Sequence, residues 1–143
     1  FLFNKPHPEL AHYEEVSKLI DSKNVIRTGF VPDDELTAIF SLATLYCQPS
    51  FYEGFGFSIL EAFACKTPVA AARTQALVEV GGDAILTFEP HSINDIVEKI
   101  SKLANDKKLQ QLLVKKGNER VKDFSWDKTI RGTLQFYEKA LNS

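Results

Sequence analysis

Apolar residues along the chain alternate between short continuous runs and longer stretches in which they recur at helical spacing. The short runs predict strands at residues 24–30, 44–49, 67–72 and 84–88. The helical spacing predicts helices at residues 8–20, 33–43, 57–66, 76–80, 91–104, 106–121 and 126–141. Strands that alternate with helices are typical of a parallel sheet covered by helices on both faces. We therefore predict an α/β fold with an open parallel sheet.

The turns that follow the predicted strands are the places to search for chemistry. In an open parallel sheet, ligands bind at the carboxyl ends of the strands. Three strand-to-helix turns meet this condition, and they follow Phe30, Pro49 and Ala72.

Length and charge limit the kinds of partner. A chain of 143 residues fits one domain, and 44% hydrophobic with 25% charged residues is the balance of an ordinary globular protein. The formal net charge of −2 provides no general positive field, so nucleic acid is not an expected partner and an anionic ligand must be held locally.

Neither a membrane span nor a signal peptide is expected from the sequence. The longest apolar runs are much shorter than the ~20 residues that a span requires, and contact with a membrane is not evident. Cys47 and Cys65 lack CxxC spacing and lie in apolar runs, which is typical of buried free thiols in a reducing compartment. A cytoplasmic location is expected.

The turn after Pro49 carries an unusual combination of residues for a simple connection. It reads Ser-Phe-Tyr-Glu-Gly-Phe-Gly over residues 50–56, directly before a predicted helix. Gly54 and Gly56 permit positive φ angles and a close approach of the backbone to a ligand. The first amides of the helix are unpaired and lie at the positive end of its dipole. This combination predicts a site for phosphate or diphosphate.

Two carboxylates flank the predicted anion site, Glu53 before the glycines and Glu61 in the helix. Carboxylates accept hydrogen bonds from vicinal hydroxyls, and a nucleotide-sugar has hydroxyls on both sides of its diphosphate. The pair therefore favours a nucleotide-sugar. The alternative is that Glu61 is a surface residue and that the glycines merely shape a tight turn.

These residues resemble a known family, the retaining nucleotide-sugar-dependent glycosyltransferases of family 4, also called glycosyl transferases group 1. The motif that carries the resemblance is E-x7-E, from Glu53 to Glu61 in EGFGFSILEAFACKTPV. NVIRTGFVPDDEL, TLYCQPS, VEVGGDAILTFEP and FSW are also similar to the family and occur in its order, over roughly residues 24–141.

The resemblance implies the GT-B fold, two Rossmann-like domains with the active site between them, of which residues 1–143 would be most of the C-terminal, donor-binding domain. It implies that Glu53 is the catalytic residue, contacting the hydroxyls of the donor hexose. Glu61 would bind the ribose, the amides of the glycine turn with Ser58 would hold the diphosphate, and the residues after Gly29 would contact the base. The implied donor-binding residues are Phe30, Val31, Gly54, Phe55, Gly56, Phe57, Ser58 and Glu61.

The implied reaction transfers a hexose from a nucleoside diphosphate, such as UDP or GDP, to an acceptor hydroxyl in carbohydrate biosynthesis. The acceptor, a sugar, a lipid or another hydroxyl compound, would bind an N-terminal domain that this sequence lacks, so the chain by itself is expected to be inactive. No cofactor and no metal are expected. The sequence departs from the family in two places: Arg73-Thr74-Gln75 replaces a glycine pair, and the basic pair near the start of the domain has no match.

Two other functions remain open at the level of sequence. One is a nucleotide-binding or interaction module that retains the fold without catalysis. The other is a nucleotide-sugar epimerase on a similar fold, which the E-x7-E spacing disfavours.

Overall fold

The structure is a computed structural model that describes residues 24–26 and 28–142. The helix predicted at residues 8–20 lies outside the described residues. The chain divides into two compact units, Phe1–Ala38 and Ile39–Ser143, and each is described by itself. Helix α2 (Asp33–Leu42) begins in the first unit and ends in the second, close to the prediction of 33–43.

The second unit is built on a parallel sheet of three strands, β1 (Tyr46–Gln48), β2 (Val69–Ala72) and β3 (Ile85–Phe88), in the order β1-β2-β3. Tyr46 pairs with Val69, which in turn pairs with Ile85. Parallel neighbours require a crossover connection, and each crossover here contains a helix. The carboxyl ends of all three strands therefore lie at one edge of the sheet.

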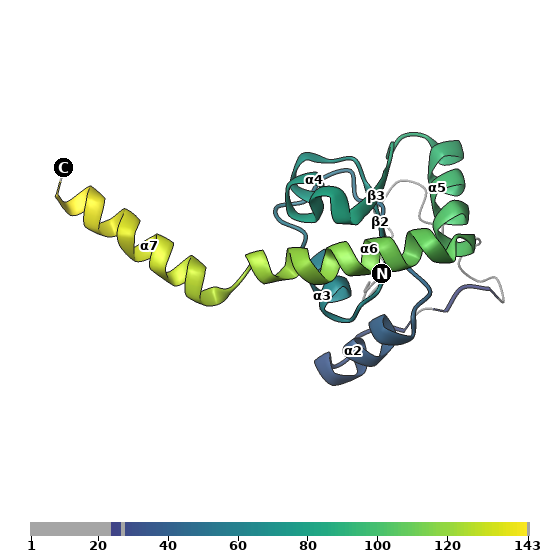
Figure 1. The fold of residues 1–143 in the computed structure, drawn as a ribbon, viewed down its shortest axis with the longest axis horizontal. Coiled ribbons are helices and arrows are strands. Elements are labelled where there is room, and N and C mark those ends of the chain that lie inside the picture. Colours follow the sequence, from purple (N-terminus) through teal and green to yellow (C-terminus); the bar gives the residue numbers. More distant parts are fainter. Residues whose placement is uncertain (1–23, 27, 143) are drawn as a thin grey trace. The chain divides into compact units, whose positions relative to one another are not determined.

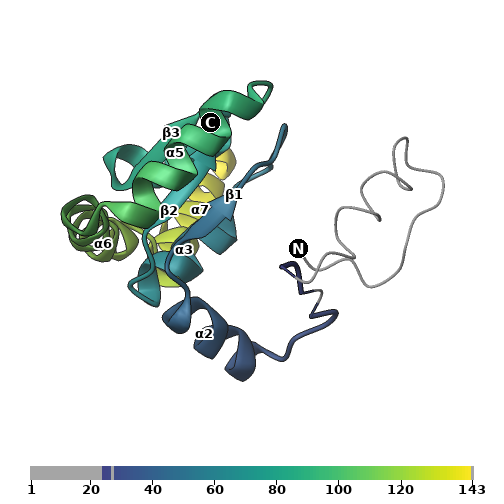
Figure 2. The same ribbon diagram turned by 90° about the vertical axis from the view of Figure 1, so that its right-hand side faces the viewer.

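Helices cover both faces of this sheet. The crossover helices are α3 (Phe57–Ala64) and α4 (Gln75–Gly81), and α4 is followed by a 3-10 turn, η1 (Gly82–Ala84). Figures 1 and 2 show α3 and α4 on one face, and α5 (Ile93–Asn105) on the other. The predicted α/β fold with helices on both faces is confirmed.

The chain continues with α6 (Lys107–Arg120), a second 3-10 turn, η2 (Val121–Asp123), and α7 (Trp126–Leu141). Each of α5, α6 and α7 starts with a capping side chain that accepts a hydrogen bond from a first-turn amide. The caps are Ser92, Asp106 and Ser125. These caps explain why the starts of the three helices lie within two residues of the sequence prediction.

The core of the second unit lies between the sheet and its helices. The largest fully buried side chains are Phe63, Phe88, Ile59, Leu77, Leu103 and Val69. Helix α6 approaches α3 closely at Gly117, where a Cβ atom would lie 2.5 Å from Cδ1 of Phe63. A side chain at residue 117 would therefore push α6 away from the core.

Three details differ from the sequence prediction. Residues 24–26 and 28–30 form no strand, because a strand requires a paired neighbour and β1 is an edge strand of the sheet in the described part of the chain. The strand predicted at 44–49 is shorter, Tyr46–Gln48, and it is half-buried because β1 is an edge strand in the described part of the chain. Helix α5 begins at Ile93, two residues after the predicted start, and on it Ile93 and Val97 are exposed while Leu103 is buried.

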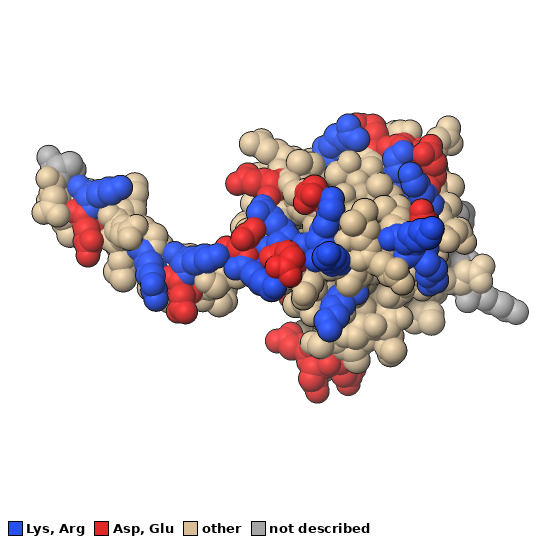
Figure 3. Space-filling model, in the orientation of Figure 1, with Lys and Arg blue, Asp and Glu red and all other residues tan. Residues whose placement is uncertain are grey.

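The lysines of α6 lie mostly on a solvated face. Figure 3 shows basic side chains over α6 with acidic groups beside them. Lys116 forms an ion pair with Asp83 at 2.8 Å, and Lys122 pairs with Glu119 at 2.8 Å. Within the described ranges, no helix has the length and apolar character needed to cross a membrane.

The cap of α6 gives a simple test of the fold. Oδ1 of Asp106 accepts a hydrogen bond from the amide of Leu109 at 3.0 Å. We expect Asp106→Ala to lower the free energy of unfolding by about 1 kcal/mol, because it leaves a first-turn amide without its partner. Urea unfolding followed by circular dichroism measures this change, and Asp106→Asn, which keeps the acceptor oxygen, should restore most of the loss.

Candidate functional site

The glycine turn connects the carboxyl end of β1 to the start of α3. Gly56 is the residue before the helix, with φ 105° and ψ 45°, and it is buried. Gly54 is exposed, and positive φ angles among the described glycines occur only at Gly29, Gly56 and Gly82. Of the two glycines of the turn, Gly56 therefore adopts the positive φ angle that the sequence permits, and Gly54 does not.

Helix α3 starts without a capping side chain, unlike α5, α6 and α7. Its first turn also contains no acidic residue. The amides at this helix start are consequently available to an anion, and the helix dipole favours negative charge there. Residues 56–58 therefore form a helix start without a capping side chain, at the place where the sequence predicts an anion site.

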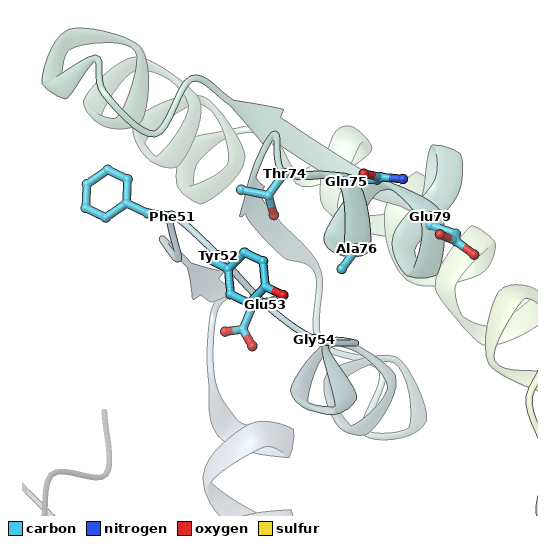
Figure 4. A pocket seen from close by; sticks show the side chains of 8 residues that line it. All are labelled: Phe51, Tyr52, Glu53, Gly54, Thr74, Gln75, Ala76 and Glu79. Carbon is cyan, nitrogen blue, oxygen red and sulfur yellow. The ribbon is translucent and has the colours of Figure 1, made fainter.

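A pocket of about 480 Å³ lies where the turns after β1 and β2 meet. Figure 4 shows the turn with Tyr52, Glu53 and Gly54 on one side, and the start of α4 with Thr74 and Ala76 on the other. The complete lining is Phe51, Tyr52, Glu53, Gly54, Thr74, Gln75, Ala76 and Glu79. Its position at the carboxyl ends of adjacent parallel strands is the usual place for a ligand in this architecture.

One polar atom of the pocket residues lacks a partner. Oγ1 of Thr74 is buried and forms no hydrogen bond with the described part of the chain. A buried hydroxyl without a partner costs free energy, so a ligand hydroxyl or phosphate oxygen that bonded to Thr74 would be favoured.

The Glu53 carboxylate is held by two donors from its own loop and strand. Its Oε1 atom accepts hydrogen bonds from Nε2 of Gln48 and from Oγ of Ser50, each at 2.6 Å. Nε2 of Gln48 also donates to Oγ of Ser50 at 2.9 Å. The side chain that the sequence singled out is therefore fixed in position before any ligand binds.

Strand β1 continues this network away from the pocket. The hydroxyl of Tyr46 donates a hydrogen bond to Oε1 of Gln48. Burial raises the pKa of Tyr46 to about 12, and a hydrogen bond with the side chain of Ser58 acts in the opposite direction. Tyr46 consequently keeps its proton, and its role as a donor, at neutral pH.

Cys47 lies between these two residues and does not belong to the network. Burial raises the pKa of its thiol to about 11, so it is not a nucleophile at neutral pH. Both cysteines are free and half-buried.

Aromatic side chains anchor the turn on either side. The ring of Phe51 stacks on His91 at 4.8 Å, which ties the turn to the loop after β3. Phe55 packs edge-on against Phe124 at 6.0 Å and lines a second, smaller cavity of about 200 Å³. Arg120 lines the same cavity, and its guanidinium donates to the carbonyls of Glu79 and Val80 at the end of α4.

The structure distributes the predicted site residues over several places. Glu53 and Gly54 line the larger pocket, Phe55 lines the smaller cavity, and Glu61 is exposed on α3. The helix start consists of Gly56, Phe57 and Ser58. Phe30, exposed, and Val31, buried, belong to the first unit and are described apart from this site. Arg73 donates to Oγ1 of Thr87 and lines neither cavity.

No three His, Cys, Asp or Glu side chains among the described residues gather closely enough to form a metal site.

Comparison with family models supplies the decisive observation. Residues 10–120 match the model of the family described as "Glycosyl transferases group 1". The chain belongs to this family.

Curated members of the glycosyl transferases group 1 family are similar to the chain in sequence. It is 36% identical to O-antigen chain mannosyltransferase B of Escherichia coli, over 77% of this chain and 29% of that protein. It is 31% identical to the MMP alpha-(1->4)-mannosyltransferase of Mycolicibacterium hassiacum, over 98% of this chain and 35% of that protein. The chain thus spans about a third of the length of these relatives.

Solved structures show the same fold. A sucrose-phosphate synthase from Thermosynechococcus elongatus is 26% identical and superposes with a TM-score of 0.80, over 94% of this chain and 36% of that one. TarM is 25% identical with a TM-score of 0.71, over 85% of this chain and 26% of that one. The second unit therefore has the fold of a GT-B glycosyltransferase domain.

Several pocket residues were not identified from the sequence. The turn after Ala72 was expected to be near a ligand, and the pocket residues Thr74, Gln75 and Glu79 follow it. The sequence did not indicate their roles. Gln48 and Ser50 both lie in the segment TLYCQPS, and Ser50 also begins the turn at 50–56, but the sequence assigned neither residue a role.

Proposed function

We propose that the chain is the donor-binding part of a retaining hexosyltransferase, which transfers a hexose from a nucleoside-diphosphate sugar to an acceptor hydroxyl. The bond between the hexose and the diphosphate breaks, and the nucleoside diphosphate leaves with the electron pair of that bond. The hexose bonds to the acceptor oxygen, and the proton of the acceptor hydroxyl passes to the released diphosphate. The observation that carries the proposal is the fixed Glu53 carboxylate in a pocket next to an uncapped helix start.

The division of roles follows from the chemistry of the groups. Glu53 orients the hexose by accepting hydrogen bonds from its hydroxyls, with Thr74 Oγ1 as a further contact. The amides of Phe57 and Ser58 hold the diphosphate and stabilise the charge that develops as it leaves. Glu61, exposed one turn into α3, binds the ribose hydroxyls.

The proposal includes a second domain that binds the acceptor, because the relatives are about three times as long as the chain. We also propose that the helix start takes the place of a metal cofactor, and that the two free thiols fit a cytoplasmic location. Mannose is the first hexose to test, since several relatives are mannosyltransferases.

Calorimetric titration of the chain with UDP, GDP and ADP tests the proposal. We expect micromolar binding of one of the three, and a Glu61→Ala variant that binds it about tenfold more weakly because a charge-assisted hydrogen bond to the ribose is lost. Glu98→Ala on α5 is the matched control, because Glu98 is exposed and lines neither cavity.

Two results would count against this assignment. If none of the three nucleotides binds, the proposal that the chain is the donor-binding part is wrong. If Glu61→Ala and Glu98→Ala weaken nucleotide binding equally, the proposed contact of Glu61 with the ribose is wrong.

A further inference from the structure

The hydrogen-bond network behind Glu53 extends beyond the residues that contact the donor in the proposed function. It begins at Oε1 of Glu53, passes through Gln48 and Ser50, and ends at the hydroxyl of Tyr46. Of these residues only Glu53, the one proposed to orient the hexose, lines either of the two cavities.

Each bond in the network constrains the next one. A side-chain amide has one accepting oxygen and one donating nitrogen. Because Tyr46 donates to Oε1 of Gln48, the Nε2 atom of Gln48 faces Ser50 and Glu53. Tyr46 and Gln48 can cooperate in this way because side chains two residues apart on a strand share a face. The ring of Tyr46 is in turn held edge-on by Phe40 at 5.2 Å.

The two donors also decide which oxygen of Glu53 is free. Both hydrogen bonds of the carboxylate within the described part of the chain end on Oε1, so Oε2 is left for a ligand. Gln48 and Ser50 are neutral, and they hold the carboxylate without cancelling its charge. A preordered carboxylate spares the ligand the entropy cost of fixing a long side chain.

We propose that Gln48 and Ser50 are positioning residues that aim Oε2 of Glu53 at the donor hexose, and that Tyr46 fixes the orientation of the Gln48 amide. The inference rests on the proposed function, since it assigns an action to residues behind that site. It names groups that make no contact with the donor themselves.

The test separates the hexose from the rest of the donor. Wild type and variants are titrated with GDP and GDP-mannose, and with UDP and UDP-glucose. The Kd of the nucleoside diphosphate divided by the Kd of the matching nucleotide-sugar measures what the hexose adds to binding. We expect Gln48→Leu and Ser50→Ala to reduce this ratio about tenfold without changing the Kd of the nucleoside diphosphate, because the diphosphate contacts are intact.

Conservative and control variants distinguish positioning from a general structural role. Ser50→Thr keeps the hydroxyl and should retain the wild-type ratio. Gln111→Leu, an exposed glutamine on α6, should leave both Kd values unchanged. In a Glu53→Gln background, Gln48→Leu should have no further effect on the ratio, because it acts only through Glu53. The Ser50 pair provides the same comparison if Gln48→Leu does not fold.

Each other outcome overturns the inference in a recognisable way. If Glu53→Gln reduces the ratio but Gln48→Leu and Ser50→Ala do not, the positioning role is wrong and the proposed function stands. If these two variants weaken nucleoside diphosphate and nucleotide-sugar equally, their role is structural. If wild type binds no member of either pair, the proposed function fails, and the positioning role fails with it.

Discussion

Replacing Glu53 by glutamine is expected to lower the rate of hexose transfer about 100-fold while leaving the fold intact. The Oε1 position receives two donated hydrogen bonds at 2.6 Å, so the glutamine must place its carbonyl oxygen there. Its NH₂ group then occupies the Oε2 position and presents a donor where the carboxylate presented an acceptor. Misorientation of the hexose by about 1 Å costs a factor of this size.

The measurement is kcat at saturating donor, in a protein that joins this chain to its acceptor-binding domain. The melting temperature and the Kd of the nucleoside diphosphate are both expected to match wild type. Such a match shows that the substitution affects only the interaction with the hexose. Glu98→Gln on α5 is the control for removing a surface carboxylate. Transfer at the wild-type rate by Glu53→Gln would exclude Glu53 from the reaction.

Substitution of Gly56 by alanine is expected to have the largest effect on stability among changes in the turn. At φ 105° any residue with a Cβ atom is strained, and the added Cβ would lie 2.8 Å from Cδ2 of the buried Leu77. Strain and overpacking together should lower the free energy of unfolding by roughly 2–3 kcal/mol. The melting temperature should fall on the order of 10 °C.

The matched control lies two residues earlier in the same turn. A Cβ atom at Gly54 would meet no atom within 4 Å, and Gly54 does not have a positive φ angle. We therefore expect Gly54→Ala to change the melting temperature by little. Differential scanning calorimetry compares the two variants, and an equal loss from both would show that Gly56 does not require its left-handed conformation.

Much of the fold follows from local sequence patterns. Helices α3, α5, α6 and α7 lie within two residues of their predicted bounds, because helical periodicity is contained in the helix itself. For α5, α6 and α7 a capping residue also marks the start. Strands β2 and β3 were likewise found from short apolar runs. The predicted strand at 24–30 is absent from the described residues, since a strand depends on a partner that its own sequence does not specify.

The candidate site divides in the same way. The turn that contains Glu53, the glycines and the start of α3 is continuous in sequence, and its composition was sufficient to indicate an anion next to hydroxyls. The opposite wall, formed by Thr74 and Glu79, comes from another strand-to-helix turn. Its residues could be assigned to the pocket only after β1 and β2 were paired.

By itself, the sequence determined the α/β class, the positions of most helices and the turn at which a ligand is expected, because each depends on residues close together in the chain. The tertiary structure decided which glycine of the turn has a positive φ angle, which oxygen of Glu53 is free and which residues close the pocket. Those features depend on contacts made after folding, such as Leu77 against Gly56 and Gln48 against Glu53. The physical reason is that close packing and hydrogen-bond direction are set by the relative positions of whole elements, which local periodicity does not contain.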